Sequence, residues 1–583
     1  MKQRLLVLCW VMWAGSGCGD DQANIGADLG AALDAAADLG AAPDSLGLDK
    51  GTVDLARSDS TWLDEGSPDQ SALDQALPDQ AVLDQASPDQ VLPDAMPPDQ
   101  TLADQTVLDQ TPPDQMAPDQ MTLDQMAPDQ MAPDMALPDQ MVLDQALPDQ
   151  AVPATGWARS AGGAASSDFA FGTAVAVDKN GYSYVGGAFS GTLKVGTTTL
   201  TSQGGNDIFV VRLDPAGNFL WAISAPGTNL ASVIRMAVDS AGDLHLVGDF
   251  QGQVTMGAVT LTSKGKQDLL VAKISATGKV ARAASFGGTG PEYGKGIALD
   301  SAGKTYVTGT FEGTVAFGSH SVTSAGSSDL FLVKLDSAGT ASWAVSAGGT
   351  QTDGGLAVAV DASGNATVAG KFEGAMTLGG VTLTSLGSSD VLAARFDSAG
   401  KPVWAASAGG LQQDEALGIG VDGAGNSVLV GYYQDAATFG STSLSSPNST
   451  AMVVARLDSK GAFTWAVSAS GSGGLMATEI VVDSAGNSLL SGTLANTVTV
   501  GGFTLTSKSM SDPLLARLDA SGKVTWAAAA PCSLFCWASS VAQDAQGNSF
   551  MAGYFLGTAT FAGAALTAGG NNDFFVWKRL AQP

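Results

Sequence analysis

The 583-residue sequence has only two histidines and four cysteines, and its 27 basic residues are outnumbered by 57 acidic ones. A catalytic dyad or metal site built on histidine or cysteine has little to draw on. A net charge of −30 lacks the basic footprint of a nucleic-acid-binding protein. Helical periodicity is absent, and no apolar run reaches the roughly 20 residues of a membrane-spanning helix. These absences favour a protein that is not an enzyme and that needs no cofactor, metal or nucleic acid.

Residues 1–18, MKQRLLVLCWVMWAGSGC, have the layout of an export signal: Lys2 and Arg4, an apolar stretch, then small residues ending at Cys18. The end of the segment resembles a bacterial lipobox, whose cysteine is diacylated and becomes the mature N-terminus, although Gly15 stands where leucine is usual. An ordinary secretory signal with a chance cysteine is the alternative. We expect lipid attachment at Cys18, and a lipid-anchored protein on the bacterial outer membrane or cell surface.

An acidic, proline-rich tract follows at 19–152. It carries 28 acidic residues against two basic ones, and from Asp44 to Asp149 an aspartate stands at every fifth position. This period matches neither helix nor strand, proline removes backbone donors, and closely spaced like charges extend a chain. We predict a disordered, extended linker. A pentapeptide-repeat solenoid fits poorly, because proline recurs where its coil needs backbone hydrogen bonds.

The remainder, 153–583, is an array of repeats with a period of 61 residues. Seven aspartates mark it: Asp178, Asp239, Asp300, Asp361, Asp422, Asp483 and Asp544. A glycine follows each after three residues, and a cation recurs in the same phase at Arg212, Lys273, Lys334, Arg395, Arg456, Arg517 and Lys578. The chain therefore contains seven units.

Each unit has the pattern of four antiparallel strands. In the fourth unit, AVAVD and ATVAGKF alternate like strands joined by DASG, and DVLAARFD and PVWAASA form a second pair joined by DSAG. We name these strands A to D in chain order; a variable segment between B and C has room for a small hairpin. Seven such units, rich in Gly, Thr, Ser and Ala, predict an all-β, seven-bladed propeller.

The ends of the array favour a closed ring. The first unit opens with a lone D-type strand at Trp157, and the last stops at the C-type strand DFFVWKRL. If the N-terminal strand paired into the final blade, it would supply the D strand that this blade lacks and leave no open edge. We expect this closure, and a monomer.

The third unit, GIALDSAGKTYVTGTFEGTVAFG...SDLFLVKLDSAG, resembles the bacterial SBBP beta-propeller repeat, and its core is similar to the NHL repeat. The resemblance covers 157–580 and implies a seven-bladed propeller on an exported or surface protein, without implying a substrate. Three departures are local: Arg282 replaces a tryptophan, Ala451 an aspartate and Leu494 an aromatic residue. We expect them to perturb packing in single blades and to leave the ring intact.

The repeated aspartates could indicate a metal or catalytic site, but a turn explains them with fewer assumptions. A calcium loop gathers several oxygen ligands, whereas DSAG offers one carboxylate. Aspartate at the first position of a type I turn caps the backbone, and glycine at the fourth takes the left-handed conformation. The histidines, His245 and His320, fall in different units, and each has a simple strand or loop role.

Function is easier to place where the units differ. In a propeller the A–B and C–D turns share one face, and the variable D–A connections and B–C segments share the other. Three successive D–A connections carry a carboxylate in one phase, Glu292, Asp353 and Asp414, and Glu415 follows the last. They form a candidate ligand or cation site at the channel mouth. Solvated carboxylates that cap strand A are the alternative.

The last two cysteines, Cys532 and Cys536, lie in PCSLFCW. In an exported protein they are candidates for a local disulfide, with free thiols as the alternative. Spacing of the CxxxC kind without a second pair does not indicate a metal site.

We expect a surface binding or adhesion module whose variable face takes an envelope glycan, protein or matrix component. A structural envelope protein without a small ligand is the second hypothesis. A propeller enzyme, such as a lyase or glycosidase, is the third.

Overall fold

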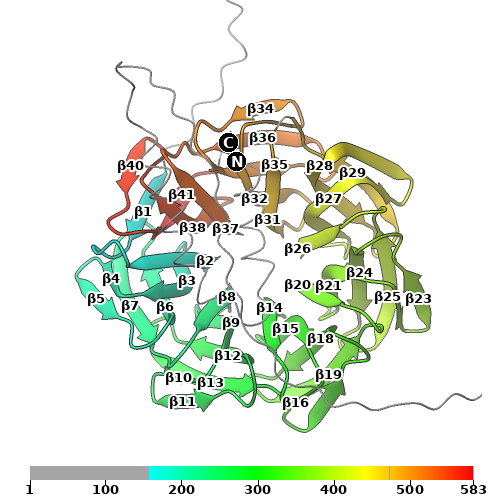
Figure 1. The fold of residues 1–583 in the computed structure, drawn as a ribbon, viewed down its shortest axis with the longest axis horizontal. Coiled ribbons are helices and arrows are strands. Elements are labelled where there is room, and N and C mark those ends of the chain that lie inside the picture. Colours follow the sequence, from blue (N-terminus) through cyan, green and yellow to red (C-terminus); the bar gives the residue numbers. More distant parts are fainter. Residues whose placement is uncertain (1–155, 472, 582–583) are drawn as a thin grey trace, which may run out of the picture. The chain divides into compact units, whose positions relative to one another are not determined.

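The computed structural model describes residues 156–471 and 473–581. Its strands form seven four-stranded antiparallel sheets arranged as blades around a central axis (Figure 1). The predicted all-β seven-bladed propeller is confirmed. Within these ranges no helix is long and apolar enough to cross a membrane. The signal 1–18 with Cys18 and the linker 19–152 lie outside the described residues, so what we infer about them stays a prediction.

Strand A of each blade is nearest the axis (Figure 1). Blades 1 to 7 take as strand A β2 (Phe169–Val177), β8 (Ala231–Val238), β14 (Glu292–Leu299), β20 (Gly354–Val360), β26 (Glu415–Val421), β31 (Leu475–Val482) and β37 (Phe535–Gln543). Strands B are β3 (Ser183–Ser190), β9 (Leu244–Phe250), β15 (Thr305–Phe311), β21 (Ala366–Phe372), β27 (Ser427–Phe439), β32 (Ser488–Leu494) and β38 (Ser549–Leu556). Strands C are β6 (Asp207–Leu213), β12 (Asp268–Ile274), β18 (Asp329–Leu335), β24 (Asp390–Phe396), β28 (Thr442–Leu457), β35 (Asp512–Leu518) and β41 (Asp573–Arg579). Strands D are β7 (Phe219–Ala225), β13 (Val280–Phe286), β19 (Ala341–Ala347), β25 (Pro402–Ala408), β29 (Phe463–Ser468), β36 (Val524–Ala529) and, for blade 7, β1 (Trp157–Ala161).

The variable segment between strands B and C folds into a hairpin in every blade. In blade 5 the hairpin continues the long strands β27 and β28, and in blade 6 a short strand, β30 (Ser470–Gly471), pairs with it. The separate hairpin strands are β4 (Thr192–Val195) with β5 (Thr198–Thr201), β10 (Gln253–Met256) with β11 (Val259–Thr262), β16 (Thr314–Phe317) with β17 (His320–Thr323), β22 (Ala375–Leu378) with β23 (Val381–Thr384), β33 (Thr497–Val500) with β34 (Phe503–Thr506), and β39 (Thr558–Phe561) with β40 (Ala564–Thr567).

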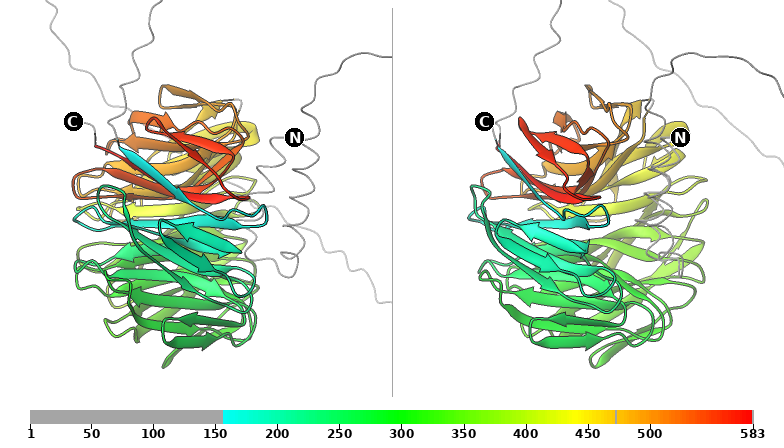
Figure 2. Two further views of the ribbon diagram at one scale, coloured as in Figure 1. Left: turned by 90° about the vertical axis from the view of Figure 1, so that its left-hand side faces the viewer. Right: turned by 60° about the vertical axis from the view of Figure 1, so that its left-hand side comes forward.

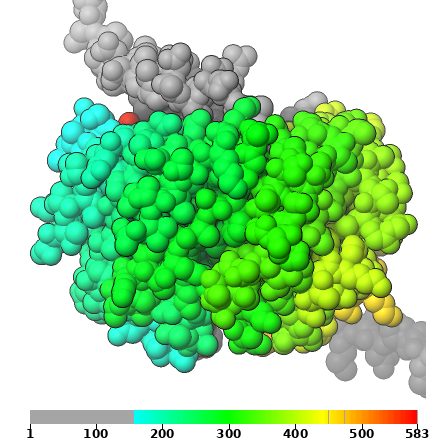
Figure 3. Space-filling model, turned by 90° about the horizontal axis from the view of Figure 1, so that it is seen from below, coloured from blue at the N-terminus to red at the C-terminus, as the bar shows by residue number. Residues whose placement is uncertain are grey.

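The hydrophobic core is divided among the junctions between neighbouring blades. Seven clusters of buried apolar side chains each join two adjacent blades, one cluster to a junction. Strands B and C are covered on both sides: β18 (DLFLVKL) is buried at every position, whereas the outer strand β19 is mostly half-buried. Two-sided burial explains the apolar runs in these strands. In the space-filling view, blades follow one another in chain order around the outer wall (Figure 3).

The ring is closed by the two ends of the repeat array, as predicted. β1 pairs antiparallel with β41, from Trp157 opposite Lys578 to Ala161 opposite Phe574. Seen from the side, the cyan β1 runs beside the red β41 (Figure 2). On its other side β41 pairs with β38. The closing strand therefore covers an edge that β41 would otherwise expose.

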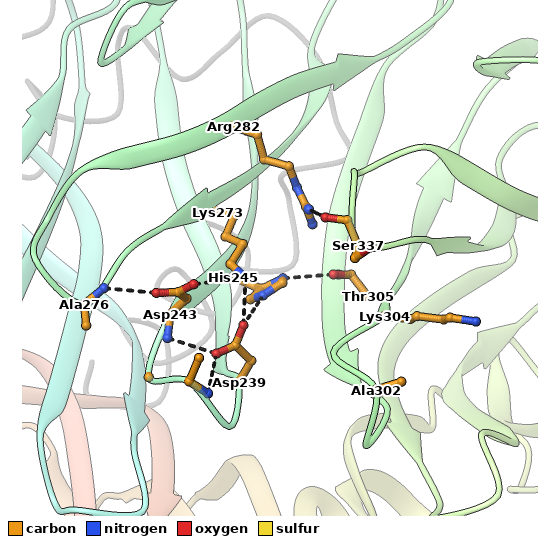
Figure 4. Close-up of polar contacts among 12 residues, drawn as sticks. Asp239, Asp243, His245, Lys273, Ala276, Arg282, Ala302, Lys304, Thr305 and Ser337 are labelled. Atoms are coloured by element: carbon orange, nitrogen blue, oxygen red, sulfur yellow. Dashed lines mark hydrogen bonds and ion pairs between the residues drawn. The ribbon is translucent and has the colours of Figure 1, made fainter.

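A tryptophan on strand D ties a blade to the next one. Trp343 Nε1 donates a 3.2 Å hydrogen bond to Ser398 O in the C–D turn of blade 4, and a Cβ added to Gly400 in that turn would lie 2.8 Å from the Trp343 ring. The same bond is made by Trp157, Trp221, Trp404 and Trp465. Arg282, which replaces tryptophan in blade 2, donates from its guanidinium to Ser337 O (Figure 4). The departure at Arg282 therefore keeps the tie between blades.

Packing is looser between blades 5 and 6, where the other two departures lie. An apolar pocket of about 340 Å³ is lined there by side chains that include Met452, Val467 and Val500. The position of Val500 is phenylalanine in three other units. Leu494 belongs to the core cluster of this junction, and Ala451 lines an adjoining pocket of about 250 Å³. Small side chains at one junction thus leave space that larger ones fill elsewhere.

The β39–β40 turn is strained at Ala562, whose φ is +48°. The six other units place glycine with a positive φ at this position: Gly196, Gly257, Gly318, Gly379, Gly440 and Gly501. A left-handed backbone costs a residue with a Cβ about 1–2 kcal/mol, part of which glycine's greater freedom in the unfolded chain offsets. We expect Ala562→Gly to raise the free energy of unfolding by about 0.5–1 kcal/mol in chemical denaturation.

Gly318→Ala is the matched control for this change. An added Cβ meets nothing within 4 Å at Gly318, so only the backbone conformation is tested. It should lower the free energy of unfolding by a similar amount. If Ala562→Gly lowered it as well, the left-handed conformation could not be the source of the strain.

Candidate functional site

The A–B and C–D turns form one face of the ring, which we call the lower face; the D–A connections and B–C hairpins form the upper face. On the lower face, Asp361 Oδ1 accepts hydrogen bonds from the backbone N–H groups of Ser363 and Asn365, both at 2.9 Å, and its Oδ2 pairs with Arg395. Five more aspartates pair with the cation of their own C strand: Asp178–Arg212, Asp239–Lys273, Asp300–Lys334, Asp422–Arg456 and Asp483–Arg517. The turn interpretation is confirmed, and in blades 1 to 6 the cations found in phase are the counter-charges of the A–B turns; Lys578 of blade 7 donates to Pro215 O instead.

His245 sits in a polar network of the lower face (Figure 4). Its Nε2 lies 3.2 Å from Asp239 Oδ2, its Nδ1 lies 2.9 Å from Thr305 Oγ1, and Lys273 Nζ pairs with the same Asp239 oxygen at 2.8 Å. Hydroxyl, imidazole and carboxylate follow the order of a catalytic triad. However, His245 is 1% and Thr305 0% exposed, so a substrate does not reach the hydroxyl. Burial lowers the pKa of His245, and the network is a structural link between blades 2 and 3.

Glu292, Asp353 and Asp414 pin the upper-face loops that lead into strand A. Each carboxylate accepts a hydrogen bond from the backbone N–H four residues earlier: Gly288 to Glu292 at 3.0 Å, Gly349 to Asp353 at 2.5 Å and Gly410 to Asp414 at 2.7 Å. All three side chains are fully buried. The alternative of solvated caps is therefore wrong about solvation, although the carboxylates do cap the loops.

The three carboxylates lie at three different blade junctions and do not converge. In the part of the chain that the structure describes, no group of three His, Cys, Asp or Glu side chains could hold a metal ion. Burial raises the pKa of Glu292 to about 8, that of Asp353 to about 6 and that of Asp414 to about 7. A ligand or cation role for Glu292, Asp353 and Asp414 therefore stays a prediction. Their hydrogen bonds show that they hold the upper-face loops.

Glu415 is placed differently from its neighbour Asp414. Its Oε1 is 2.8 Å from Lys371 Nζ of blade 4 and accepts a 2.8 Å hydrogen bond from Gln413 Nε2. Glu415 is buried, and Lys371 is half-buried. The ion pair joins blades 4 and 5 at the upper ends of their inner strands.

We call the upper parts of strands A and B the inner rim. Its charged arc runs over blades 2 to 5 and contains Asp249 and Lys295 as well as the Lys371–Glu415 pair. Enclosure raises the pKa of Asp249 to about 6, against the lowering effect of Lys295, and burial lowers the pKa of Lys295. Both side chains are half-buried. Solvent therefore still reaches Asp249, Lys295 and Lys371, whereas Glu415 is buried.

An aromatic arc occupies the inner rim on blades 7 and 1. Phe171 stacks with Phe169 at a centroid distance of 4.7 Å and meets Tyr554 edge-on at 4.6 Å, and Phe535 lies 5.9 Å from Tyr554. All four rings are half-buried. Partly exposed rings gathered on one side of a face are typical of binding surfaces.

Further from the upper face, one ion pair crosses the axis. Arg235 Nε of blade 2 lies 3.4 Å from Glu479 Oε1 of blade 6, and Val541 N of blade 7 donates a 3.0 Å hydrogen bond to Glu479 Oε2. The two charged residues hold the same position in their A strands, four repeats apart. Blades 2 and 6 are not neighbours, so this pair ties the ring across its centre below the inner rim.

In blade 7 a disulfide does what a carboxylate does in blades 3 to 5. The structure joins Cys532 Sγ to Cys536 Sγ. In the repeat, these two positions are those of Gly410 and Asp414. A covalent bond therefore closes the loop that an amide-to-carboxylate hydrogen bond closes in blades 3 to 5.

The aromatic arc and most of the charged arc were missed by reasoning from sequence. The signal that marks them is variation within one repeat position. The position of Lys371 holds a different kind of side chain around the ring: Ala188, Asp249, Thr310, Tyr432, Thr493 and Tyr554. Variation at this one position, which lies at the upper end of strand B, is therefore the signal for the inner rim.

The fold and the pairing of its strands place the chain among seven-bladed β-propellers. No protein-family model matches the chain, and no curated protein matches it. Among solved structures it is similar to the Pan2 WD40 domain of Neurospora crassa, with a TM-score of 0.36 and 9% identity over 71% of this chain and 90% of that chain. It is also similar to a gluconolactonase of Xanthomonas campestris, with a TM-score of 0.26 and 12% identity over 58% of this chain and 90% of that chain. At these scores the likeness adds nothing to the fold assignment, which rests on the strand pairing.

Proposed function

We propose that this protein is an exported surface protein, lipid-anchored through Cys18, whose propeller binds an envelope or matrix ligand at the inner rim of its upper face. The observation that carries the proposal is the contrast between the two faces. On the lower face, the A–B turn aspartates of blades 1 to 6 are each paired with the cation of their own C strand. On the upper face, the inner rim varies from blade to blade and keeps half-buried aromatic and charged groups.

The two arcs favour a ligand with an apolar face and polar edges, and we propose a glycan. The flat, partly exposed rings of Phe171 and Tyr554 suit the C–H face of a sugar ring, while Lys371 and Asp249 offer a donor and an acceptor for hydroxyl groups. A polar polymer is also what an anchored protein meets in a cell envelope.

A glycan array probed with the purified chain tests this proposal. Phe171→Ala removes a central ring of the aromatic arc and is expected to weaken binding about 30-fold, the loss of about 2 kcal/mol that a central aromatic contact commonly contributes. Lys401→Ala, an exposed change in a lower-face turn, is the control and should leave affinity unchanged. Equal losses in the two variants, or no binding to any glycan, would count against the inner rim as a sugar site.

A further inference from the structure

At two junctions the first residue of strand C holds the upper-face loop of the next blade. In the loop that enters blade 2, Gly227 N donates a 2.8 Å hydrogen bond to Asp207 Oδ1. In the loop that enters blade 7, Cys532 N donates a 3.0 Å hydrogen bond to Asp512 Oδ1. At both junctions one buried carboxylate accepts a hydrogen bond from the loop amide.

At three other junctions a second carboxylate takes this amide. The amides of Gly288, Gly349 and Gly410, which hold the same repeat position as Gly227, donate to Glu292, Asp353 and Asp414. The aspartate at the start of strand C then keeps only the amide four residues before it: Lys264 N donates to Asp268, Ala325 N to Asp329 and Leu386 N to Asp390. Buried oxygens without a hydrogen-bond partner remain at Asp268 Oδ2, Asp329 Oδ1, Asp390 Oδ1 and Glu292 Oε1. We call Asp268–Glu292, Asp329–Asp353 and Asp390–Asp414 the acid pairs.

In the third acid pair the two members border the same small space. A Cβ added to Gly409 would lie 2.6 Å from Asp390 Oδ1 and 2.9 Å from Asp414 Oδ2. The strand-C aspartate repels its partner in each pair and raises the partner's pKa further. All six carboxyl groups are at most 2% exposed.

Other charged groups near the acid pairs do not cancel this repulsion. Lys264, which donates to Gly287 O at 3.3 Å, faces the first pair together with Glu312. Glu373 faces the second pair. Glu415 faces the third, and its own charge is already met by Lys371. Two or three backbone amides and at most one nearby cation are thus set against two buried carboxylates, whose double charge burial disfavours strongly.

We propose that each acid pair holds one proton at mildly acidic pH, and that losing these protons as the pH rises loosens the upper-face loops of blades 3 to 5. The buried oxygens without a donor support this, because a retained proton removes one of the two negative charges that burial disfavours. The proton belongs to the pair and not to a single residue. The loops that enter blades 2 and 7, each with a single carboxylate at this amide, lack the feature and do not respond.

The pH range follows from the raised pKa values. Glu292 at about 8, Asp414 at about 7 and Asp353 at about 6 all lie above the values of unfolded carboxyl groups. The folded protein therefore binds more protons than the unfolded chain. The stabilisation is fully present at about pH 4 and is lost as the pH rises from about 6 to 8.

Infrared titration of the full folded chain from pH 5 to 9 tests the proposal through the protonated-carboxyl band. We expect this band at pH 5 and its loss by pH 9. Glu292→Gln should remove the most alkaline part of the loss. It keeps the hydrogen bond from Gly288, because Glu292 Oε1 has no partner that an amide group would displace. Asp249, whose pKa is also about 6, contributes to the band, so the assignment rests on the variants.

Two further measurements separate pairing from burial alone. Asp268→Asn removes the repulsion on Glu292 and should move its titration to lower pH, whereas Asp207→Asn, at a junction with a single carboxylate, should leave the band unchanged. Amide hydrogen exchange should show protection at Gly288, Gly349 and Gly410 falling between pH 6 and 9, with protection at Gly227 and Cys532 preserved. An absent band at pH 5, a titration unmoved by Asp268→Asn, or an equal loss of protection at all five amides would overturn the proposal.

Discussion

Deleting the closing strand Trp157–Ala161 is expected to lower the free energy of unfolding by more than about 5 kcal/mol, the scale of a whole domain's stability. The strand supplies five paired residues along β41 and the indole bond to Pro215 O. Ala158 and Ala161 are buried in the core clusters on either side of blade 7. Without β1, strand β41 becomes an open edge and both clusters lose cover. Chemical denaturation measures the loss, and size-exclusion chromatography would show association through the open edge.

Trp157→Phe is the control for this deletion. It keeps the strand and an aromatic ring and removes the N–H donor to Pro215 O. Loss of one hydrogen bond should cost about 0.5–1.5 kcal/mol. A deletion variant that unfolds at the same denaturant concentration as the parent would show that β1 does not close the ring.

The second large effect is expected at Gly400, in the C–D turn beneath Trp343. Its φ is +83°, and an added Cβ would lie 2.8 Å from the indole ring. The left-handed conformation costs alanine about 1–2 kcal/mol, and forcing the ring away adds about 1–3 kcal/mol. Gly400→Ala should therefore lower the free energy of unfolding by about 2–5 kcal/mol in chemical denaturation.

Gly303→Ala separates the two causes. Gly303 has a φ of +73° in an A–B turn, and an added Cβ meets nothing within 4 Å. Only the conformational cost of about 1–2 kcal/mol applies there. Equal losses at Gly400 and Gly303 would mean that the contact with Trp343 contributes nothing to the tie between blades.

The fold could be predicted because its determinants are local and repeated. The aspartate and glycine of each DxxG turn act within four residues, so Asp361 and Gly364 mark a hairpin without knowledge of the rest of the molecule. Seven equal spacings then number the blades. The closing strand at Trp157 was visible as a D strand without a blade, and the final unit as a blade without a D strand.

The inner rim could not be predicted in the same way, since its contacts join residues far apart in the chain. Lys371 and Glu415 come from different units, and Arg235 meets Glu479 four repeats later. The sequence also contains no sign of which carboxylates are buried. Glu292 looks like any loop carboxylate in sequence, because a hydrogen bond to a backbone amide leaves no mark on the residue that donates it. Contacts across a ring follow from its closure and not from local pattern.

Because β1 pairs with β41, the propeller could be circularly permuted. Arg579 at the end of β41 and Trp157 at the start of β1 stand as the two ends of a C–D hairpin, with Trp157 opposite Lys578 as Trp221 is opposite Arg212. A seven-residue link that contains a DSAG-like turn, as 214–220 does between Leu213 and Trp221, would join them covalently, and the chain could then begin at the C–D turn of any other blade. A ring of seven blades could be encoded by seven equivalent blade orders. In this chain, hydrogen bonds between β1 and β41 close the ring at the point where the other blades have a covalent C–D turn.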